Sequence, residues 1–118
     1  MPQITVDYSA VLSEGFDRPA FAKALHDEVV RTAAAKPAAC KTQFRATEDT
    51  VVGPDTDGHA IVHVTLGLLA GRTDETKVTL TENVLELLRE HVKVGEGLAF
   101  HASAEVRDLD PSYRKVDV

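Results

Sequence analysis

The sequence has one cysteine, no tryptophan and no long apolar run, and each scarcity narrows the class of protein. Its single cysteine, Cys40, cannot form an intrachain disulfide, which favours a reducing compartment and a buried structural thiol. No apolar stretch approaches about 18 residues, so we expect no membrane-spanning helix. The first residues, MPQITVDYSAVLSEG, have no basic leader region, so we expect no signal peptide and a cytoplasmic protein.

Basic residues are also fewer than acidic residues. The 13 Lys and Arg residues against 19 Asp and Glu give a formal net charge of -6. This balance argues against broad binding of nucleic acid or of an anionic membrane, although a few basic residues could still build a local cationic pocket. The five histidines share no metal-ligand spacing, so we expect no metal site.

The 118 residues, 43% of them hydrophobic, predict a single globular domain over residues 1–118. Period-two alternation predicts strands at 2–9, 39–49, 60–69 and 98–109. Helical periodicity predicts helices within 14–36 and 73–92, with Asp17 and Thr73 as N-caps. In the second helix we expect a buried stripe flanked by Val84 and Leu87 and made of Val78, Thr81, Leu85, Leu88 and Val92.

Helices between strands at this spacing imply parallel crossovers. The sequence therefore predicts an α+β fold, in which two β-α-β units form a four-stranded sheet with both helices on one face. The units cover about residues 2–48 and 60–107, and a tail follows at 108–118. The other face of the sheet would be bare and would carry residues such as Ile61, His63 and Ser103. A bare face with small and apolar residues needs a partner, so we expect an oligomer that packs these faces together.

Two stretches carry a family resemblance: the MP that opens the first strand, and AIVHVTLGLLAGR at residues 60–72, directly before a helix. They resemble the tautomerase superfamily, and within it the 5-carboxymethyl-2-hydroxymuconate isomerase family, whose AFVHxTL…GR signature matches residues 60–72 without a gap. The resemblance covers the whole chain in element order. It implies a homotrimer whose sheets surround a central axis, in agreement with the bare face.

The resemblance also implies a chemistry. Members are keto–enol tautomerases, isomerases of the intramolecular-oxidoreductase type, which use neither a metal nor an organic cofactor. By position, Pro2 matches the catalytic base, an amine freed when Met1 is removed, and Arg72 matches one carboxylate-binding arginine. Lys41 stands where a second arginine is expected. Arg45, which lies four residues later on the same face of the strand, is the alternative. The implied substrate is a small unsaturated 2-hydroxy or 2-oxo diacid of the 5-carboxymethyl-2-hydroxymuconate type, from aromatic catabolism.

Elementary chemistry is consistent with this interpretation. A free α-amine has a reference pKa of about 7.7–8.0, and burial and nearby cations lower it toward the range of a useful base. Three alternatives stay open. The same amine could serve a decarboxylase or hydratase, the scaffold could be a non-catalytic trimeric binding or structural protein, and Pro2 could simply start a strand.

Overall fold

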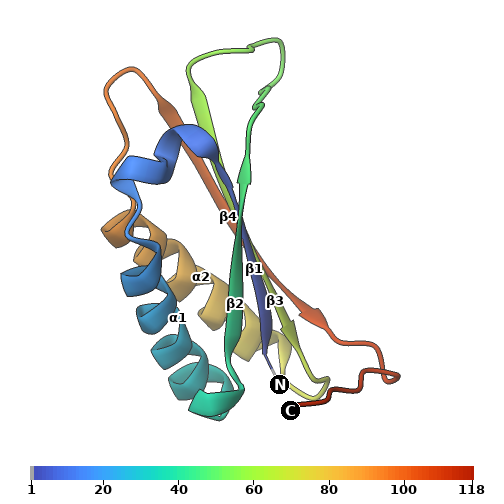
Figure 1. Cartoon of the computed structure of the whole chain (residues 1–118). Helices are drawn as coiled ribbons and strands as arrows, with labels where there is room; N and C mark the ends of the chain where they lie inside the picture. The colour runs from blue at the N-terminus through green and yellow to red at the C-terminus, as the bar shows by residue number, and fades with distance from the viewer. Residues whose placement is uncertain (1) are drawn as a thin grey trace.

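The computed structural model describes residues 2–118, so the expected removal of Met1 lies outside the described residues. The chain forms four strands and two α-helices, with two short 3-10 helices between them (Figure 1). In chain order the elements are β1 (Gln3–Ser9), η1 (Ala10–Gly15), α1 (Arg18–Ala33), η2 (Pro37–Ala39), β2 (Lys41–Thr47), β3 (His59–Leu68), α2 (Asp74–His91) and β4 (Ala99–Asp108). The C-terminal tail, residues 109–118, follows β4.

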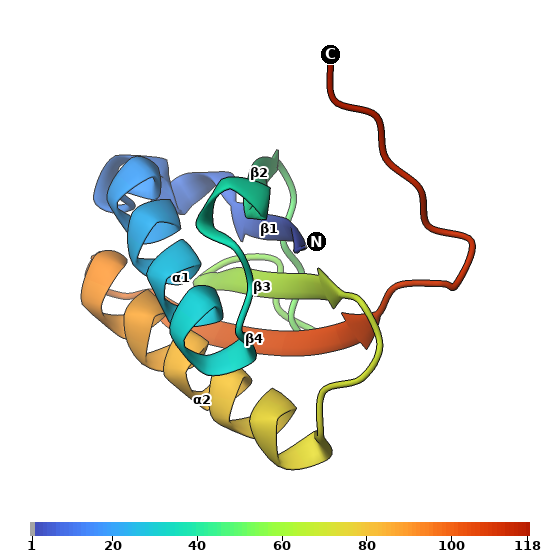
Figure 2. The same ribbon diagram turned by 90° about the horizontal axis from the view of Figure 1, so that it is seen from below.

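The strands form one mixed sheet in the order β2-β1-β3-β4. β1 runs parallel to β2 and β3 runs parallel to β4, whereas the two central strands, β1 and β3, are antiparallel. Both α-helices cover the same face of the sheet (Figure 2). The predicted α+β fold of two β-α-β units with both helices on one face is confirmed. Within residues 2–118, no helix is long and apolar enough to cross a membrane.

The two β-α-β units repeat the same local arrangement at their starts. Gln3 pairs with Lys41 in the first unit, and His59 pairs with Ala99 in the second. In each unit the first residue of the second strand donates a backbone hydrogen bond to the residue that precedes the first strand. The Lys41 N–H donates to the Pro2 carbonyl at 3.3 Å, and the Ala99 N–H donates to the Gly58 carbonyl at 2.9 Å. Because β1 and β3 are antiparallel, these two starts lie at opposite ends of the sheet.

Both helices begin at the predicted caps. The Asp17 carboxylate accepts a hydrogen bond from the Ala20 backbone N–H at 3.1 Å, and the Thr73 hydroxyl accepts one from the Thr76 N–H at 3.1 Å. These bonds satisfy backbone donors that have no partner inside the helix. α1 ends where Ala34 adopts a left-handed conformation with φ of 56°.

The core lies between the helices and the sheet. The row of α2 that is buried in it consists of Leu80, Val84 and Leu88, each 0% exposed. Val78, which the sequence places in the buried stripe, is 54% exposed, so that part of the prediction is wrong. Rows that start at Val78 and at Leu80 share the same three- and four-residue spacing, and only packing against the sheet decides which of them faces inward.

The second face of the sheet has no helix over it (Figure 2). Polar side chains on this open face pair across strands. Arg45 on β2 forms two hydrogen bonds with Asp7 on β1, at 2.7 and 3.1 Å. On the other half of the face, His63 of β3 contacts Ser103 of β4 at 2.6 Å and Glu105 at 3.3 Å.

Candidate functional site

One end of the sheet holds three of the four residues that the sequence singled out, Pro2, Lys41 and Arg72. Pro2 is buried at the start of β1, and the Lys41 backbone N–H reaches its carbonyl. On its other side β1 pairs with the end of β3, where Gln3 lies opposite Gly67, and Arg72 follows β3 a few residues later. Both chain termini, the end of α1 and the start of α2 lie at this same end of the molecule (Figure 1).

A cavity of about 380 Å³ opens beside Lys41, and we call it the lysine pocket. It is lined by Lys36, Ala38, Ala39, Lys41, Lys115 and Asp117. Three of these six residues are lysines, contributed by the turn before η2, by β2 and by the C-terminal tail. A hollow with three ammonium groups is suited to an anion, although each lysine acts as a point charge and lacks the planar fork of arginine.

The one acidic residue in the lysine pocket is Asp117. Its carboxylate is paired with the Lys115 ammonium. The hydrogen bond from Lys115, followed by the positive charges of Lys115 and Lys41, holds the pKa of Asp117 below its ordinary value. The field inside the pocket therefore favours a carboxylate in its ionised form.

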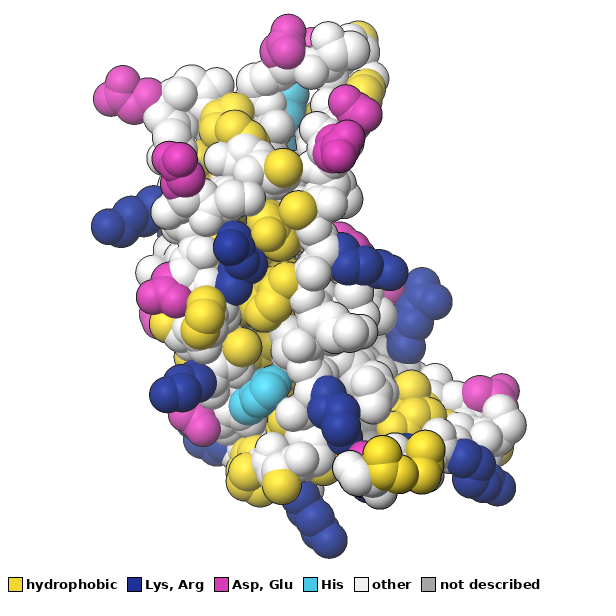
Figure 3. Space-filling model, viewed as in Figure 1, with side chains coloured by type: hydrophobic (Ala, Val, Ile, Leu, Met, Phe, Trp, Pro, Cys, Tyr) yellow, Lys and Arg dark blue, Asp and Glu magenta, His cyan; other side chains and the backbone are white. Residues whose placement is uncertain are grey.

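Charge is unevenly distributed over the molecule despite its net negative total. On the face shown in Figure 3, basic side chains are numerous over the lower part of the molecule, where the termini lie in Figure 1. Acidic side chains gather around the opposite, upper end. An anionic ligand would thus meet a positive potential at the end of the sheet that holds Pro2.

Arg72 is fixed by backbone carbonyls. Its Nε and Nη2 donate to the Ala33 carbonyl at the end of α1, at 3.1 and 2.8 Å, and its Nη1 donates to the Leu69 carbonyl at 2.9 Å. These three bonds use three of the five N–H groups of a guanidinium. The side chain also lines an open cavity of about 480 Å³, together with Thr32, Thr73 and Thr76. Arg72 is therefore a held cation with donors left for a ligand.

The two candidates for a second anion contact are placed differently. Lys41 is directly paired with the first residue of β1, one position from Pro2. Arg45 lies four residues further along β2, about 13 Å away at 3.3 Å per residue, where it is engaged by Asp7. Lys41 is therefore the candidate nearer to Pro2, and Arg45 forms a cross-strand ion pair with Asp7 on the open face.

Cys40, next to Lys41 in sequence, is buried, as the sequence predicts. Its Sγ lies 3.5 Å from the Lys36 carbonyl. Burial raises the pKa of this thiol above its ordinary value, because its effect outweighs the opposing effect of the positive charge on Lys41. A thiol held protonated at neutral pH is a poor nucleophile, so its placement fits a packing role.

Sequence reasoning missed Lys36, Lys115 and Asp117. Lys36 is the last residue of the predicted first helix, and nothing in that pattern indicates a ligand contact. The tail has no hydrophobic period, and nothing in its local pattern indicates that it returns to the start of β1. Gln3 Nε2 donates to the Tyr113 hydroxyl at 3.1 Å, a contact across 110 positions that only the folded chain reveals.

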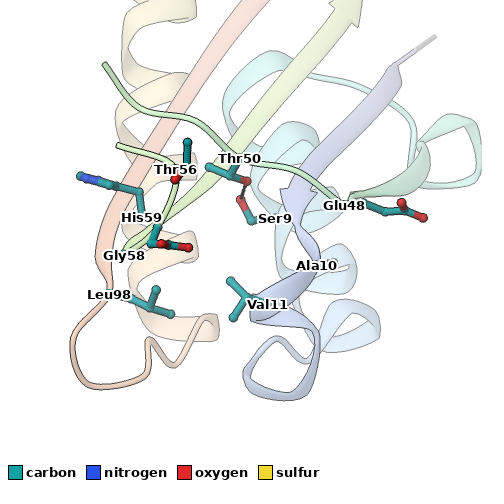
Figure 4. A pocket seen from close by; sticks show the side chains of 10 residues that line it. Ser9, Ala10, Val11, Glu48, Thr50, Thr56, Gly58, His59 and Leu98 are labelled. Carbon is teal, nitrogen blue, oxygen red and sulfur yellow. Dashed lines mark hydrogen bonds between the residues drawn. The ribbon is translucent and has the colours of Figure 1, made fainter. Parts of the chain in front are cut away.

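The opposite end of the sheet has a smaller cavity of about 200 Å³ between β1, the β2–β3 connection and the start of β3 (Figure 4). Two of its hydroxyls already have partners within the protein, because Ser9 Oγ contacts Thr50 Oγ1 at 2.7 Å and accepts from the Ile61 N–H at 2.8 Å. The charged groups that line it include Glu48 and Asp57. This cavity does not offer an anion the cations found at the other end.

Comparison with known proteins gives one family and several similar folds. The profile of the family described as 5-carboxymethyl-2-hydroxymuconate isomerase matches residues 2–116. No curated protein sequence matches the chain. A solved structure of a 5-carboxymethyl-2-hydroxymuconate isomerase from Deinococcus radiodurans R1 is similar, with a TM-score of 0.79 and 17% identity, over 98% of this chain and 90% of that one.

Two further solved structures share the fold. A fused 4-OT described as a wild-type symmetric trimer has a TM-score of 0.76 at 20% identity, over 97% of this chain and 92% of its own. The FG41 malonate semialdehyde decarboxylase inhibited by 3-bromopropiolate has a TM-score of 0.61 at 24% identity, over 87% of this chain and 82% of its own. At these identities the structures establish the shared architecture, which carries several activities.

Proposed function

Because the chain belongs to the 5-carboxymethyl-2-hydroxymuconate isomerase family, we propose that it is a cofactor-independent keto–enol tautomerase acting on a small unsaturated 2-hydroxy or 2-oxo diacid. The observation that carries the proposal is that Pro2, Lys41 and Arg72 gather at one end of the sheet, with the lysine pocket beside them. The family is one of isomerases, and the substrate type and the roles of these residues are the proposal.

In the proposed mechanism Pro2 is the base. Removal of Met1 would turn its ring nitrogen into a free secondary amine at the start of β1. A free α-amine has a reference pKa of about 7.7–8.0, and the burial of Pro2 and the lysines nearby both favour its neutral form. The neutral amine has a lone pair whose direction is fixed by the ring and by the strand that follows.

The proposed reaction moves one proton from the 2-hydroxyl oxygen of the substrate to one of its carbons. The amine accepts the proton of the 2-hydroxyl group, the C2–O bond becomes a carbonyl, and the double bonds shift along the carbon chain. The ammonium then returns the proton to a distal carbon, where a new C–H bond forms and a conjugated ketone results. Lys41 and Arg72 hold the two carboxylates and stabilise the negative charge that develops on the oxygen.

We also expect the protein to assemble as a homotrimer through the open face of its sheet. Both helices lie on the other face, so no helix covers the open face of β3 and β4 within one chain (Figure 2). Ile61 on β3, next to the buried Val62, is only partly buried. A structure with the same fold is described as a symmetric trimer. Sedimentation should give three times the 12.8 kDa chain mass, and Ile61→Lys should shift it to that of one chain.

The activity is tested in two steps. The intact mass of the purified protein should lack Met1, because a Pro2 nitrogen held in a peptide bond cannot act as a base. Ketonisation of 2-hydroxymuconate, followed by its ultraviolet absorbance, should then be fast in the parent protein. Pro2→Ala exchanges the ring nitrogen for a primary amine that the ring no longer aims, so it should lower kcat/KM by about tenfold or more while partial activity remains; full loss of a positioned base would cost about 10²-fold or more.

Lys41→Gln serves as the second variant, and Lys23→Gln, at an exposed position on α1, is its matched control. We expect Lys41→Gln to raise KM and the control to leave it unchanged. Wild-type rates in Pro2→Ala, or a retained Met1 in active protein, would contradict the mechanism. Decarboxylation of malonate semialdehyde without ketonisation would replace it with the other activity found on this fold.

A further inference from the structure

The C-terminal tail is attached at two points to the end of the sheet that holds Pro2. The Leu109 N–H donates to the Leu68 carbonyl at 2.7 Å, and the Leu109 side chain packs against Gly67, where an added Cβ would come within 2.9 Å of it. Further along, the Tyr113 hydroxyl accepts a hydrogen bond from Gln3 at 3.1 Å. These contacts anchor the tail to the ends of β1 and β3, and two of its last residues, Lys115 and Asp117, line a cavity with Lys41.

The tail contributes one cation, Lys115, and one anion, Asp117, to the lining of the lysine pocket. Lys115 and Asp117 line it together with Lys36 and Lys41. The Asp117 carboxylate is paired with Lys115 and lies in the positive field of Lys41. A carboxylate of the chain itself thus lines a cavity whose other charged groups are three lysines.

We propose that Asp117 is a built-in competitor for a substrate carboxylate, so that a dicarboxylate binds the lysine pocket only after it has displaced Asp117 from Lys115. The inference rests on the proposed function, because it assigns this pocket to one carboxylate of the diacid. Lys115 then becomes a contact of the bound ligand, and the tail determines specificity. A monoanion held only at Arg72 gains nothing from the displacement.

The strength of the pair fits this exchange. The side chains of Lys115 and Asp117 are 41% and 60% exposed, so water and salt screen the attraction between them. An exposed single pair is weak enough to open when a ligand brings its own carboxylate. Only molecules in which Asp117 has left Lys115 can bind the ligand. The apparent Kd is therefore the intrinsic Kd divided by the fraction of molecules in that open state.

The test is an equilibrium titration with trans,trans-muconate, a six-carbon unsaturated dicarboxylate, followed by calorimetry on the full chain. Asp117→Asn keeps the size of the side chain and removes its charge, and we expect muconate to bind about three- to tenfold more tightly. Asp57→Asn makes the same charge change in the cavity at the other end of the sheet, and should change the affinity less than about twofold.

A double-mutant cycle separates displacement from a general charge effect. In a Lys115→Gln background Asp117 has lost its partner, so Asp117→Asn should give less than about a twofold gain. An equal gain in both backgrounds, weaker binding by Asp117→Asn, or no muconate binding by any variant would overturn the inference. Because the titration involves no turnover, a protein that binds as expected but lacks isomerase activity would refute the proposed function alone.

Discussion

Replacing Arg72 by alanine should lower stability as well as ligand binding, because its guanidinium joins two segments of the backbone, the end of α1 and the connection that follows β3. It donates twice to the Ala33 carbonyl and once to the Leu69 carbonyl. A hydrogen bond to a charged group contributes about 1.5–3 kcal/mol. The two bonds to Ala33 share one acceptor and are partly buried, and the bond to Leu69 is exposed. We therefore expect a loss of about 2–3 kcal/mol from the free energy of unfolding.

Urea unfolding followed by circular dichroism measures this loss. With a slope of about 1–3 kcal/mol per molar urea, the midpoint should fall by roughly 0.7–3 M. Arg89→Ala, at an exposed position on α2, is the control and should cost less than about 1 kcal/mol. Arg72→Lys keeps the charge but loses the fork that grips Ala33, so its midpoint should fall between the other two.

Two outcomes would refute the reasoning. If Arg72→Ala unfolds within about 0.5 kcal/mol of the parent protein, the bonds to the two carbonyls do not hold the fold together. If it binds muconate as tightly as the parent protein while losing stability, Arg72 is a structural residue and the carboxylate contact lies elsewhere. Only a joint loss of stability and affinity supports both of its proposed roles.

Three further predictions concern the body of the domain. Leu80→Ala should cost about 2–5 kcal/mol in urea unfolding, whereas Val78→Ala should cost less than about 1 kcal/mol, because only Leu80 is buried. Burial opposes ionisation of Glu28, but hydrogen bonds from Thr32 and Asn83 and the charge of Arg31 outweigh it and lower its pKa. Its contribution to stability is therefore present above about pH 4.5 and lost as pH falls through the lowered value, so urea midpoints of Glu28→Gln should vary less between about pH 5 and 3. Cys40 should react with a thiol reagent only as fast as the chain opens; rapid labelling of the native protein would contradict its burial.

Most of the fold could be predicted because its signals are local. Alternation along β1 and β3 identifies strands with one buried face, and Asp17 and Thr73 identify where helices start, since each cap acts on a backbone donor three residues away. The orientation of α2 could not be predicted equally well. Two rows of apolar residues on the same helix compete, and the sheet selects the row of Leu80 through contacts distant in sequence.

In the candidate site, too, some residues could be identified from the sequence and others depend on contacts between distant parts of the chain. Pro2, Lys41 and Arg72 could be named because they match a family pattern, and the parallel pairing of β1 with β2 makes the first two neighbours. The sequence left Lys41 and Arg45 as alternatives, and only the register, with Asp7 opposite Arg45, separates them. Lys115 and Asp117 lie beyond reach of any local pattern, because the route of the tail depends on tertiary contacts such as Tyr113 to Gln3.

The paired starts of the two β-α-β units have a consequence for stoichiometry. By its backbone hydrogen bond Gly58 is the internal counterpart of Pro2, yet its nitrogen lies in the middle of the chain and is an amide. An amide nitrogen has no basic lone pair, so the duplicated architecture can present an amine at one pole of the sheet and never at the other. Under the proposed mechanism each polypeptide therefore offers one place for proton transfer, and a trimer of this chain should bind three ligands rather than six.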